Sequence, residues 1–303
     1  MLDQEISYFS KNIKSKFLSN YSLKKLNWFN IGGTAKFFFK PETLDELAQF
    51  LKNFGNKINI FVLGAGSNVL LNDKLFDGVV IKLGKNFSNI TLMPNNIIVA
   101  GAGVNDKKLS DFALKNSIGG FEFLSCIPGT VGGGLKINSG CYGREFKDIL
   151  LSVQVIDKKN GLIKTIPSSN INLGYRKSDL HKDYIYLSAS FKGKKKKSEE
   201  IENEINFLKN KKNISQPSKI KTGGSTFKNP KEQSSEKVWS LIKKSVPLDT
   251  SFGEASISQK HCNFLVNAGN ASFDDMIKLI QFIKKNVKSK TGVTLETEIE
   301  IIK

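Results

Sequence analysis

The stretch VLGAGSNVLL, residues 62–71, continues an apolar run that begins at residue 58, and together they predict a buried strand entering a glycine turn. Glycines at such a turn let backbone N–H groups approach a phosphate closely. The dinucleotide fingerprint G-x-G-x-x-G would need a third glycine at position 69, where Val69 stands. The turn therefore indicates a phosphate-binding surface, but not one of the Rossmann type.

A second glycine-rich loop, SCIPGTVGGGLKINSGCYG, spans residues 125–143. It is not a P-loop, because Leu135 separates Gly134 from Lys136. A second possible G-x-G-x-x-G fingerprint starts at Gly101, but Asp106 stands where its third glycine would be needed. A loop so rich in small residues is either a flexible turn or a backbone surface pressed against a flat or anionic ligand. Its structured flanks favour the ligand-binding interpretation.

The composition is that of a soluble globular chain, with 303 residues, 39% hydrophobic and 24% charged. The formal net charge of +18 is compatible with a nucleic-acid partner. However, the lysines are scattered, and Arg144 and Arg176 are the only arginines in the sequence. Because base reading relies on bidentate arginine, we expect a lysine-biased surface and no nucleic-acid partner.

The sequence predicts a cytoplasmic protein without membrane insertion. It has no uninterrupted apolar run of about 18 residues, and its first residues lack a leader pattern. Cys126, Cys141 and Cys262 are widely spaced without a C-x-x-C pair, which argues against a disulfide framework and a zinc site. His181 and His261 have no second ligand nearby in the sequence, so we expect no metal.

Hydrophobic periodicity predicts alternating helices and strands. A helix begins with the capping-box spacing of Thr43 and Glu46. Antiparallel strands are expected within 78–101, a helix over 106–117, a hairpin over 150–166 and a strand over 183–192. Further along the chain, residues 263–269 are strand-like and residues 272–290 carry a helical stripe. The composition changes to Lys, Ser, Glu and Asn between 192 and 218, which predicts a domain boundary near 195–215.

The end of the chain, VTLETEIEII at 293–302, alternates with the period of a strand. Its apolar residues lie on one face, and Glu296, Glu298 and Glu300 lie on the other. Either this face is a solvent-exposed edge, or one of its carboxylates points into a cleft.

Seven segments arrive in an order that resembles the UDP-N-acetylenolpyruvoylglucosamine reductase (UDP-N-acetylmuramate dehydrogenase) family. The likeness extends from about residue 25 to 302. The segments are IGGTAKFFF (31–39), VLGAGSNVLL (62–71), FEFLSCIPGTVGGGLKINSGCYG (121–143), GYRKSDL (174–180), GGSTFKNP (223–230), ISQKHCNFLVNAGNAS (257–272) and LETEIEII (295–302). The short connection after residue 180 is similar to the subtype that lacks an extra tyrosine-bearing loop. One departure is Cys126, where members commonly have glycine before Ile-Pro-Gly.

The resemblance implies an α+β fold: a two-lobed FAD-binding domain of the p-cresol methylhydroxylase type and a smaller α+β substrate-binding domain. The expected bounds are 1–200, with a lobe boundary near 70, and 201–303, with strand 293–302 returning to the first lobe. FAD would be bound non-covalently. Its expected contacts are Gly64, Ala65, Gly66, Ser67, Asn68, Pro128, Gly129, Thr130, Gly132, Gly133 and Gly143.

The resemblance also implies the reaction: NADPH reduces FAD, and the enolpyruvyl ether of UDP-N-acetylglucosamine then receives the hydride, giving UDP-N-acetylmuramate for peptidoglycan synthesis, cell shape and division. The family's catalytic residues fall on Arg176, Ser225 and Glu298. Contacts to the substrate would come from Tyr175, Lys228 and Asn229. We expect a monomer.

The chemistry explains why a lysine-rich chain has arginine at 176. Negative charge spreads into the substrate carboxylate as an enolate, and a planar guanidinium fork meets a planar carboxylate better than a lysine point charge. A structural ion pair is the alternative role for Arg176. The alternative function is another FAD-linked oxidoreductase of the same fold acting on an alcohol or sugar. Since no histidine precedes residue 181, histidyl flavin attachment in the N-terminal part is excluded.

Overall fold

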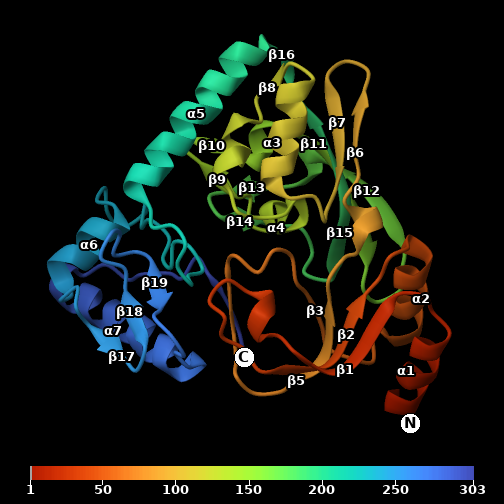
Figure 1. The fold of residues 1–303 in the computed structure, drawn as a ribbon, viewed down its shortest axis with the longest axis horizontal. Helices are drawn as coiled ribbons and strands as arrows, with labels where there is room; N and C mark the ends of the chain where they lie inside the picture. The colour runs from red at the N-terminus through yellow and green to blue at the C-terminus, as the bar shows by residue number, and fades with distance from the viewer. Residues whose placement is uncertain (1) are drawn as a thin grey trace. The chain divides into compact units, whose positions relative to one another are not determined.

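The computed structural model describes residues 2–303, and the chain forms two compact units within them (Figure 1). The first unit contains residues up to 21, 35–65 and 77–211. The second contains 22–34, 66–76 and 212–303. The sequence predicts a boundary near 200, with all earlier residues in one domain, and the two units differ from this prediction. The second unit takes in segments 22–34 and 66–76 because the last strand of the chain pairs with residues 69–71.

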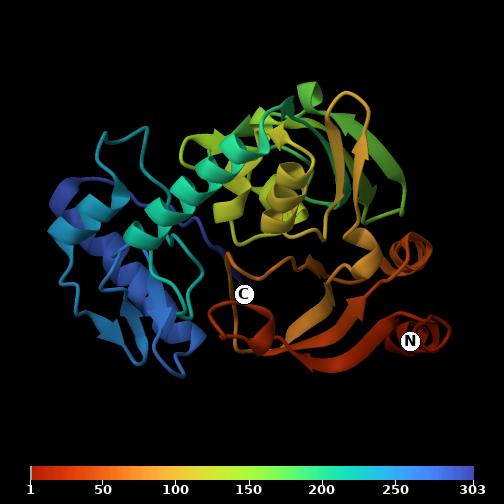
Figure 2. The same ribbon diagram turned by 45° about the horizontal axis from the view of Figure 1, so that its top comes forward.

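The first lobe of the first unit is a sheet of strand order β1-β2-β5-β3 with two helices beside it. Its strands are β1 (Lys16–Ser22), β2 (Thr34–Lys40), β3 (Ile60–Val62) and β5 (Phe76–Ile81), and its helices are α1 (Leu2–Lys11) and α2 (Leu44–Phe54). Both ribbon views place α1 next to α2 (Figure 2). Phe9 of α1 contacts the rings of Phe50 and Phe54 at 5.7 and 5.6 Å between centroids.

Helix α2 begins where the sequence predicts, because Thr43 Oγ1 accepts a hydrogen bond from the backbone N–H of Glu46 at 3.2 Å. Helix α1 was not predicted. Its stabilising face is small, with Ile6 fully buried and Phe9 packed against the aromatic rings of α2 and β2. Strand β5 pairs in parallel with β3, so the expectation that 78–83 belongs to an antiparallel set is wrong.

The second lobe is an antiparallel sheet of order β12-β11-β15-β7-β6. Its strands are β6 (Ile90–Met93), β7 (Ile97–Gly101), β11 (Leu150–Asp157), β12 (Ile163–Pro167) and β15 (Tyr184–Lys192). The predicted hairpin at 150–166 is confirmed, and Gly161 at its turn has φ of +70°. Helices α3 (Asp106–Lys115) and α4 (Val131–Lys136) share a hydrophobic core with this sheet.

Short elements complete the first unit around these lobes. They are η2 (Lys85–Phe87), β8 (Ile118–Gly119), η3 (Glu122–Cys126), β9 (Gly140–Cys141), β10 (Arg144–Glu145), η4 (Phe146–Asp148), η5 (Ser168–Asn170), β13 (Leu173–Gly174), β14 (Lys177–Ser178) and β16 (Lys194–Lys195). Helix α5 (Ser198–Ser215) runs through the polar stretch that the composition marked as a boundary. The hairpin β13–β14 matters most here, because residues 175 and 176 form its turn.

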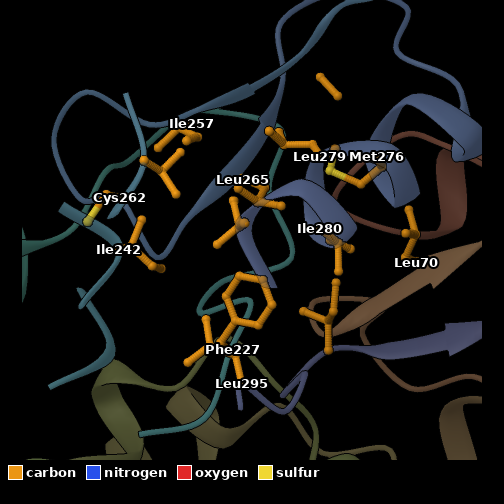
Figure 3. Packing of buried hydrophobic residues seen from close by; sticks show 14 of the residues in the cluster. Leu70, Phe227, Ile242, Ile257, Cys262, Leu265, Met276, Leu279, Ile280 and Leu295 are labelled. Carbon is orange, nitrogen blue, oxygen red and sulfur yellow. The ribbon is translucent and has the colours of Figure 1, made fainter. Parts of the chain in front are cut away.

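The second unit packs α6 (Val238–Ser245) and α7 (Phe273–Thr291) with a sheet of order β17-β18-β19. The strands are β17 (Ser251–Phe252), β18 (Ala255–Ile257) and β19 (Leu265–Asn267), and η1 (Lys24–Leu26) lies earlier in the chain. The last strand, β20 (Glu300–Ile302), pairs in parallel with β4 (Val69–Leu71). Figure 3 shows Leu70, Phe227 and Leu295 in one buried cluster with Met276 and Ile280 of α7.

The predicted strand at 293–302 is regular only over Glu300–Ile302. The apolar side chains that alternate along this segment nonetheless point into the core, because Val293, Leu295 and Ile299 are buried. Residues 296–298 instead make single hydrogen bonds to the segment around Thr226, which interrupts the ladder. Among residues 2–303, none of the helices combines the length and hydropathy needed to cross a bilayer.

The start of α7 provides a test of local stability. Ser272 Oγ accepts from the N–H of Asp275 at 3.1 Å, and Asp275 Oδ2 accepts from the N–H of Ser272 at 3.0 Å. Loss of this N-cap costs about 1 kcal/mol, whereas glycine at an N-cap costs only a few tenths. We expect Ser272→Ala to lower the free energy of unfolding in urea by about 1 kcal/mol and Ser272→Gly by much less. Equal losses would contradict the capping role.

The same cap makes a pH-dependent prediction. Hydrogen bonds from the backbone and then the side chain of Ser272 hold the pKa of Asp275 below its usual value. A depressed folded-state pKa contributes stability above the unfolded pKa that is lost as the pH falls through the folded one. Unfolding in urea should therefore show wild type more stable than Asp275→Asn at pH 7, with the difference shrinking below about pH 4. A constant difference down to pH 2 would count against an ionised cap.

Candidate active site

The first glycine turn begins at the carboxyl ends of parallel strands. Leu63 follows β3, and its N–H bonds Ile81 O at 2.8 Å. At Gly64, an added Cβ would lie 2.7 Å from Thr130 Oγ1 and would meet no other atom within 4 Å. The structure thus brings Gly64 of the first turn beside Thr130 of the second glycine loop, within one unit.

The next residues of the turn belong to the second unit. Gly66 has φ of +70°, and a Cβ there would lie 2.2 Å from Leu26 O, so only glycine fits. Its carbonyl accepts from the N–H of Trp28 at 2.9 Å. Asn68 Nδ2 donates to Glu298 O at 3.1 Å, and Asn68 O accepts from the N–H of Glu300 at 2.9 Å. Asn68 is therefore tied to the segment that carries Glu298 and leads into β20.

The second glycine loop lies along the end of β7. The N–H of Val131 bonds Val104 O and that of Gly132 bonds Ala102 O, both at 2.9 Å. Gly133 is exposed, and an added Cβ there would meet only Thr130 Oγ1, at 3.5 Å. Gly143, at the other end of the loop, has φ of +83°, and an added Cβ there would meet nothing within 4 Å. Bare backbone is thus presented at both ends of the loop.

A buried carboxyl group behind this loop was missed by the sequence analysis, which used Asp106 only to reject a fingerprint. Asp106 is fully buried, its N–H bonds Gly129 O at 3.1 Å, and its Oδ2 lies 2.5 Å from the Cβ position of Gly129. Burial raises the pKa of Asp106 well above its usual value. The backbone N–H of Asp106 therefore supports the loop at Gly129, and its buried carboxyl group leaves no room for a Cβ there.

These loops fit FAD. The backbone at Gly64 and Gly133 is unobstructed apart from the Thr130 hydroxyl, so a flat or anionic group can approach it. Thr130 is the N-cap residue of α4, but its hydroxyl makes no capping hydrogen bond. The residues that would hold FAD in the first unit are Gly64, Ala65, Pro128, Gly129, Thr130, Gly132, Gly133 and Gly143; those in the second are Gly66, Ser67 and Asn68.

Arg176 lies at the turn of the β13–β14 hairpin in a left-handed conformation, with φ of +53°. For a residue other than glycine this costs about 1–2 kcal/mol, so the surrounding structure must hold it. Its Nη2 donates to Gly140 O at 2.8 Å, and its guanidinium lies 5.2 Å from the ring centroid of Tyr175. The guanidinium is therefore positioned by a backbone carbonyl and an aromatic ring of the same unit.

Asn138 anchors this hairpin and was not singled out from the sequence. It is fully buried, with Nδ2 donating to Gly174 O at 2.9 Å and to Glu145 Oε2 at 3.0 Å. Its Oδ1 accepts from the N–H of Lys147 at 3.0 Å. Asn138 thus joins the glycine loop to the residue two positions before Arg176. The sequence offered one signal for Asn138: it is a polar amide that directly follows the apolar Ile137 and precedes the small residues Ser139 and Gly140.

Ser225 and Glu298 are brought together in the second unit. Ser225 pairs with Phe264 as an isolated bridge, and Phe227 pairs with Thr297. The N–H of Glu298 donates to Thr226 O at 2.8 Å. The backbone of Glu298 therefore lies opposite Thr226, the residue that follows Ser225.

Asn263, also missed from the sequence, clamps the Ser225 segment. Its side chain accepts from the N–H of Phe227 and donates to Phe227 O, both at 3.0 Å. Its backbone O accepts from the N–H of Thr226 at 2.7 Å. The neighbouring His261 Nδ1 accepts from the N–H of Asn263 at 3.2 Å, and burial lowers the pKa of His261. His261 therefore has a hydrogen-bonding role beside the Ser225 segment.

The predicted substrate contacts of the second unit have protein partners. Lys228 Nζ lies 3.3 Å from Glu296 Oε2, an exposed carboxylate. Asn229 Oδ1 accepts from the N–H of Val238 at 3.0 Å, which stabilises the start of α6. Their contact with a substrate stays a prediction, as does the contact of Tyr175. The roles of Arg176, Ser225 and Glu298 likewise stay predictions, since the first belongs to one unit and the others to the second.

Family models and relatives identify the class of protein. Residues 35–166 match the model described as FAD binding domain, and residues 216–302 match UDP-N-acetylenolpyruvoylglucosamine reductase, C-terminal domain. A reductase of that name from Pelagibacter ubique is 62% identical over 300 residues, covering 99% of both chains. One from Rickettsia akari is 43% identical over 290 residues, covering 96% of this chain and 97% of its own.

A solved structure agrees with these matches. The crystal structure of UDP-N-acetylenolpyruvylglucosamine reductase from Thermus caldophilus superposes with a TM-score of 0.81 at 30% identity, covering 96% of this chain and 99% of that chain. The fold and the bare glycine loops therefore define an FAD-dependent oxidoreductase with a two-lobed flavin domain of the p-cresol methylhydroxylase type. The chain belongs to the UDP-N-acetylenolpyruvoylglucosamine reductase family. An alcohol or sugar oxidase of the same fold is not favoured.

The anchoring role of Asn138 can be measured. Asn138→Ala would leave buried partners of the side chain without hydrogen bonds, which costs about 1–3 kcal/mol. We expect the free energy of unfolding in urea to fall by that amount. Asn172→Ala, at an exposed asparagine in the same region, is the control and should stay within about 0.5 kcal/mol of wild type. Similar values for the two variants would show that Asn138 does not hold the hairpin.

Proposed function

We propose that Arg176, Ser225 and Glu298 are the residues with which this chain carries out its family's reaction. That reaction is the NADPH-dependent reduction of UDP-N-acetylglucosamine enolpyruvate to UDP-N-acetylmuramate through non-covalently bound FAD. The observation that carries the assignment is Arg176 itself. It is one of two arginines, it lies at positive φ in the turn of the hairpin, and its Nη2 donates a hydrogen bond to Gly140 O.

FAD, which the two glycine loops would hold, would supply hydride transfer between NADPH and the vinyl carbon of the substrate. The protein must then stabilise the charge that moves into the substrate carboxylate. The Arg176 guanidinium, always ionised and planar, offers paired N–H donors to that carboxylate. Its contacts with Gly140 O and Tyr175 support this role, because a preorganised donor needs no rearrangement during the reaction.

Ser225 would donate the proton that completes the reaction at the α-carbon of the substrate. Hydrogen bonds of Thr226 and Phe227 to Asn263 fix the backbone immediately after it. Glu298 would polarise the enol or relay a proton, and its backbone is held by Thr226 O and Asn68 Nδ2. We assign substrate contacts to Tyr175, Lys228 and Asn229. Lys228 would exchange its exposed partner Glu296 for the substrate diphosphate.

We extend the proposal to the cellular setting. The product is a peptidoglycan precursor, which connects the chain to cell-wall growth, cell shape and cell division. The nucleotide co-substrates, together with cysteines spaced unlike a disulfide framework, favour the cytoplasm. We propose that the protein works there as a monomer.

The basic experiment is spectroscopic. The purified chain should be yellow, and denaturation should release free FAD. Adding NADPH should bleach the flavin absorbance, and adding the enolpyruvyl nucleotide should restore it. Bleaching by an alcohol or a sugar, with no response of the reduced flavin to the nucleotide, would contradict the proposed function.

The role of Ser225 can be tested by measuring the two half-reactions, reduction and reoxidation of the flavin, separately. Ser225→Ala should still be bleached by NADPH at the wild-type rate, because the hydroxyl is not needed for that step. Reoxidation by the enolpyruvyl nucleotide should slow by about 10²-fold or more, as expected when a positioned proton donor is removed. Stopped-flow absorbance measures both rates. A reoxidation rate near wild type would show that Ser225 is not the donor.

The role of Arg176 has a matched control in the other arginine. Arg176→Lys should retain substrate binding better than turnover, with a loss of about 10²–10³ in rate, since a preorganised donor is replaced by a point charge. Arg144→Lys alters an exposed ion pair with Asp148 and should leave turnover unchanged. Equal effects of the two substitutions on kcat would refute the assignment.

A further inference from the structure

Lys82 lies beside the first glycine turn. It directly follows β5, and its N–H bonds Phe39 O at 3.0 Å, which fixes the backbone in the sheet. Its amine donates a hydrogen bond to Gly64 O. Both residues follow the carboxyl ends of parallel strands, β5 and β3. Ligands of parallel α/β sheets bind at this edge.

The charge of Lys82 lacks a counter-ion in the protein. Among residues 2–303, no carboxylate forms an ion pair with this half-buried amine, whose one charged neighbour is Lys40. Lys40 is itself paired with Glu42 at 3.4 Å. Burial, and then the repulsion of Lys40, lower the pKa of Lys82. A partly buried cation without a counter-ion is unfavourable, so the site favours an anion.

The groups around the Gly64 carbonyl suit a phosphate. An added Cβ at Gly64 would meet only the Thr130 hydroxyl, at 2.7 Å, and one at Gly133 would meet only the same hydroxyl, at 3.5 Å. Backbone N–H groups, a hydroxyl and an ammonium are the donors that phosphate oxygens accept in proteins. Lysine binds phosphate as a point charge, which requires no bidentate geometry.

We propose that Lys82 is the cationic contact for the diphosphate of FAD, acting beside the backbone of Gly64 and the hydroxyl of Thr130. This inference rests on the proposed function, which requires that the chain bind FAD. Neither the glycine loops nor the motif resemblance assigns Lys82 to the cofactor. The amine holds the Gly64 carbonyl in the cofactor-free protein, and the anion adds the missing negative charge when the cofactor binds.

The test compares ligands with and without the diphosphate. Flavin fluorescence quenching would give the Kd of the FAD-free full chain for FAD and for riboflavin. A charge-assisted hydrogen bond contributes about 1.5–3 kcal/mol, so Lys82→Met should weaken FAD binding by about 10- to 100-fold. Riboflavin affinity should change by less than about twofold. Lys85→Met, which removes an exposed lysine three residues away, should leave both affinities unchanged.

Stability of the FAD-free protein separates ligand binding from a structural role. Because burial disfavours the charged amine, Lys82→Met should unfold in urea at the same concentration as wild type or a higher one. Lys82→Arg, which keeps the charge, should bind FAD more tightly than Lys82→Met. Lower stability together with equal losses of FAD and riboflavin affinity would mean that Lys82 only supports the turn, and would overturn the inference.

The outcomes also distinguish this inference from the proposed function. A wild-type chain that binds no flavin would refute both. A wild-type chain that binds FAD and is reoxidised by the enolpyruvyl nucleotide, while Lys82→Met binds FAD with wild-type affinity, would refute the role of Lys82 alone.

Discussion

The bare backbone of Gly64 faces the hydroxyl of Thr130: an added Cβ at Gly64 would lie 2.7 Å from Thr130 Oγ1 and would meet no other atom within 4 Å. This close approach links the two lobes of the first unit. Parallel strand β3 delivers Gly64 to the edge of one sheet, and the segment after β7 holds Thr130 through hydrogen bonds of Val131 and Gly132. The flavin domain is therefore defined by backbone exposed between two glycine loops, and not by the strand-to-helix turn of a Rossmann fold.

Buried asparagine side chains hold the segments that carry the proposed catalytic residues in both units. Asn138 fixes the hairpin that carries Arg176, and Asn263 fixes the segment that carries Ser225. Asn267 does the same for the start of the second unit, donating to Phe29 O at 2.8 Å. An amide side chain can bond a backbone N–H and a C=O at once, so it can replace a strand neighbour where the chain is irregular. Such rigid support is what electrostatic stabilisation of a transition state requires.

Local features were predictable from the sequence, and long-range ones were not. The caps at Thr43 and Ser272 were readable because their partners lie three residues away. The family and the cofactor were also identified, because seven segments occur in a fixed order.

Asn138 could not be assigned from spacing, since its partner Gly174 O lies 36 residues further along the chain. The terminal alternation predicted a long strand, but residues 296–298 bond the segment around Thr226, leaving only Glu300–Ile302 to pair with β4. The parallel partnership of β3 and β5 also depends on tertiary context, because a short apolar run does not reveal the direction of its neighbour.

The most direct measurement is a crystal structure of the protein with FAD and the enolpyruvyl nucleotide bound. The account predicts the substrate carboxylate within hydrogen-bonding distance of the Arg176 guanidinium. It also predicts that Ser225 Oγ and Glu298 face the carbon that neighbours the hydride acceptor. A substrate carboxylate held by other residues, with the Arg176 guanidinium on Gly140 O and out of reach of the substrate, would contradict the account.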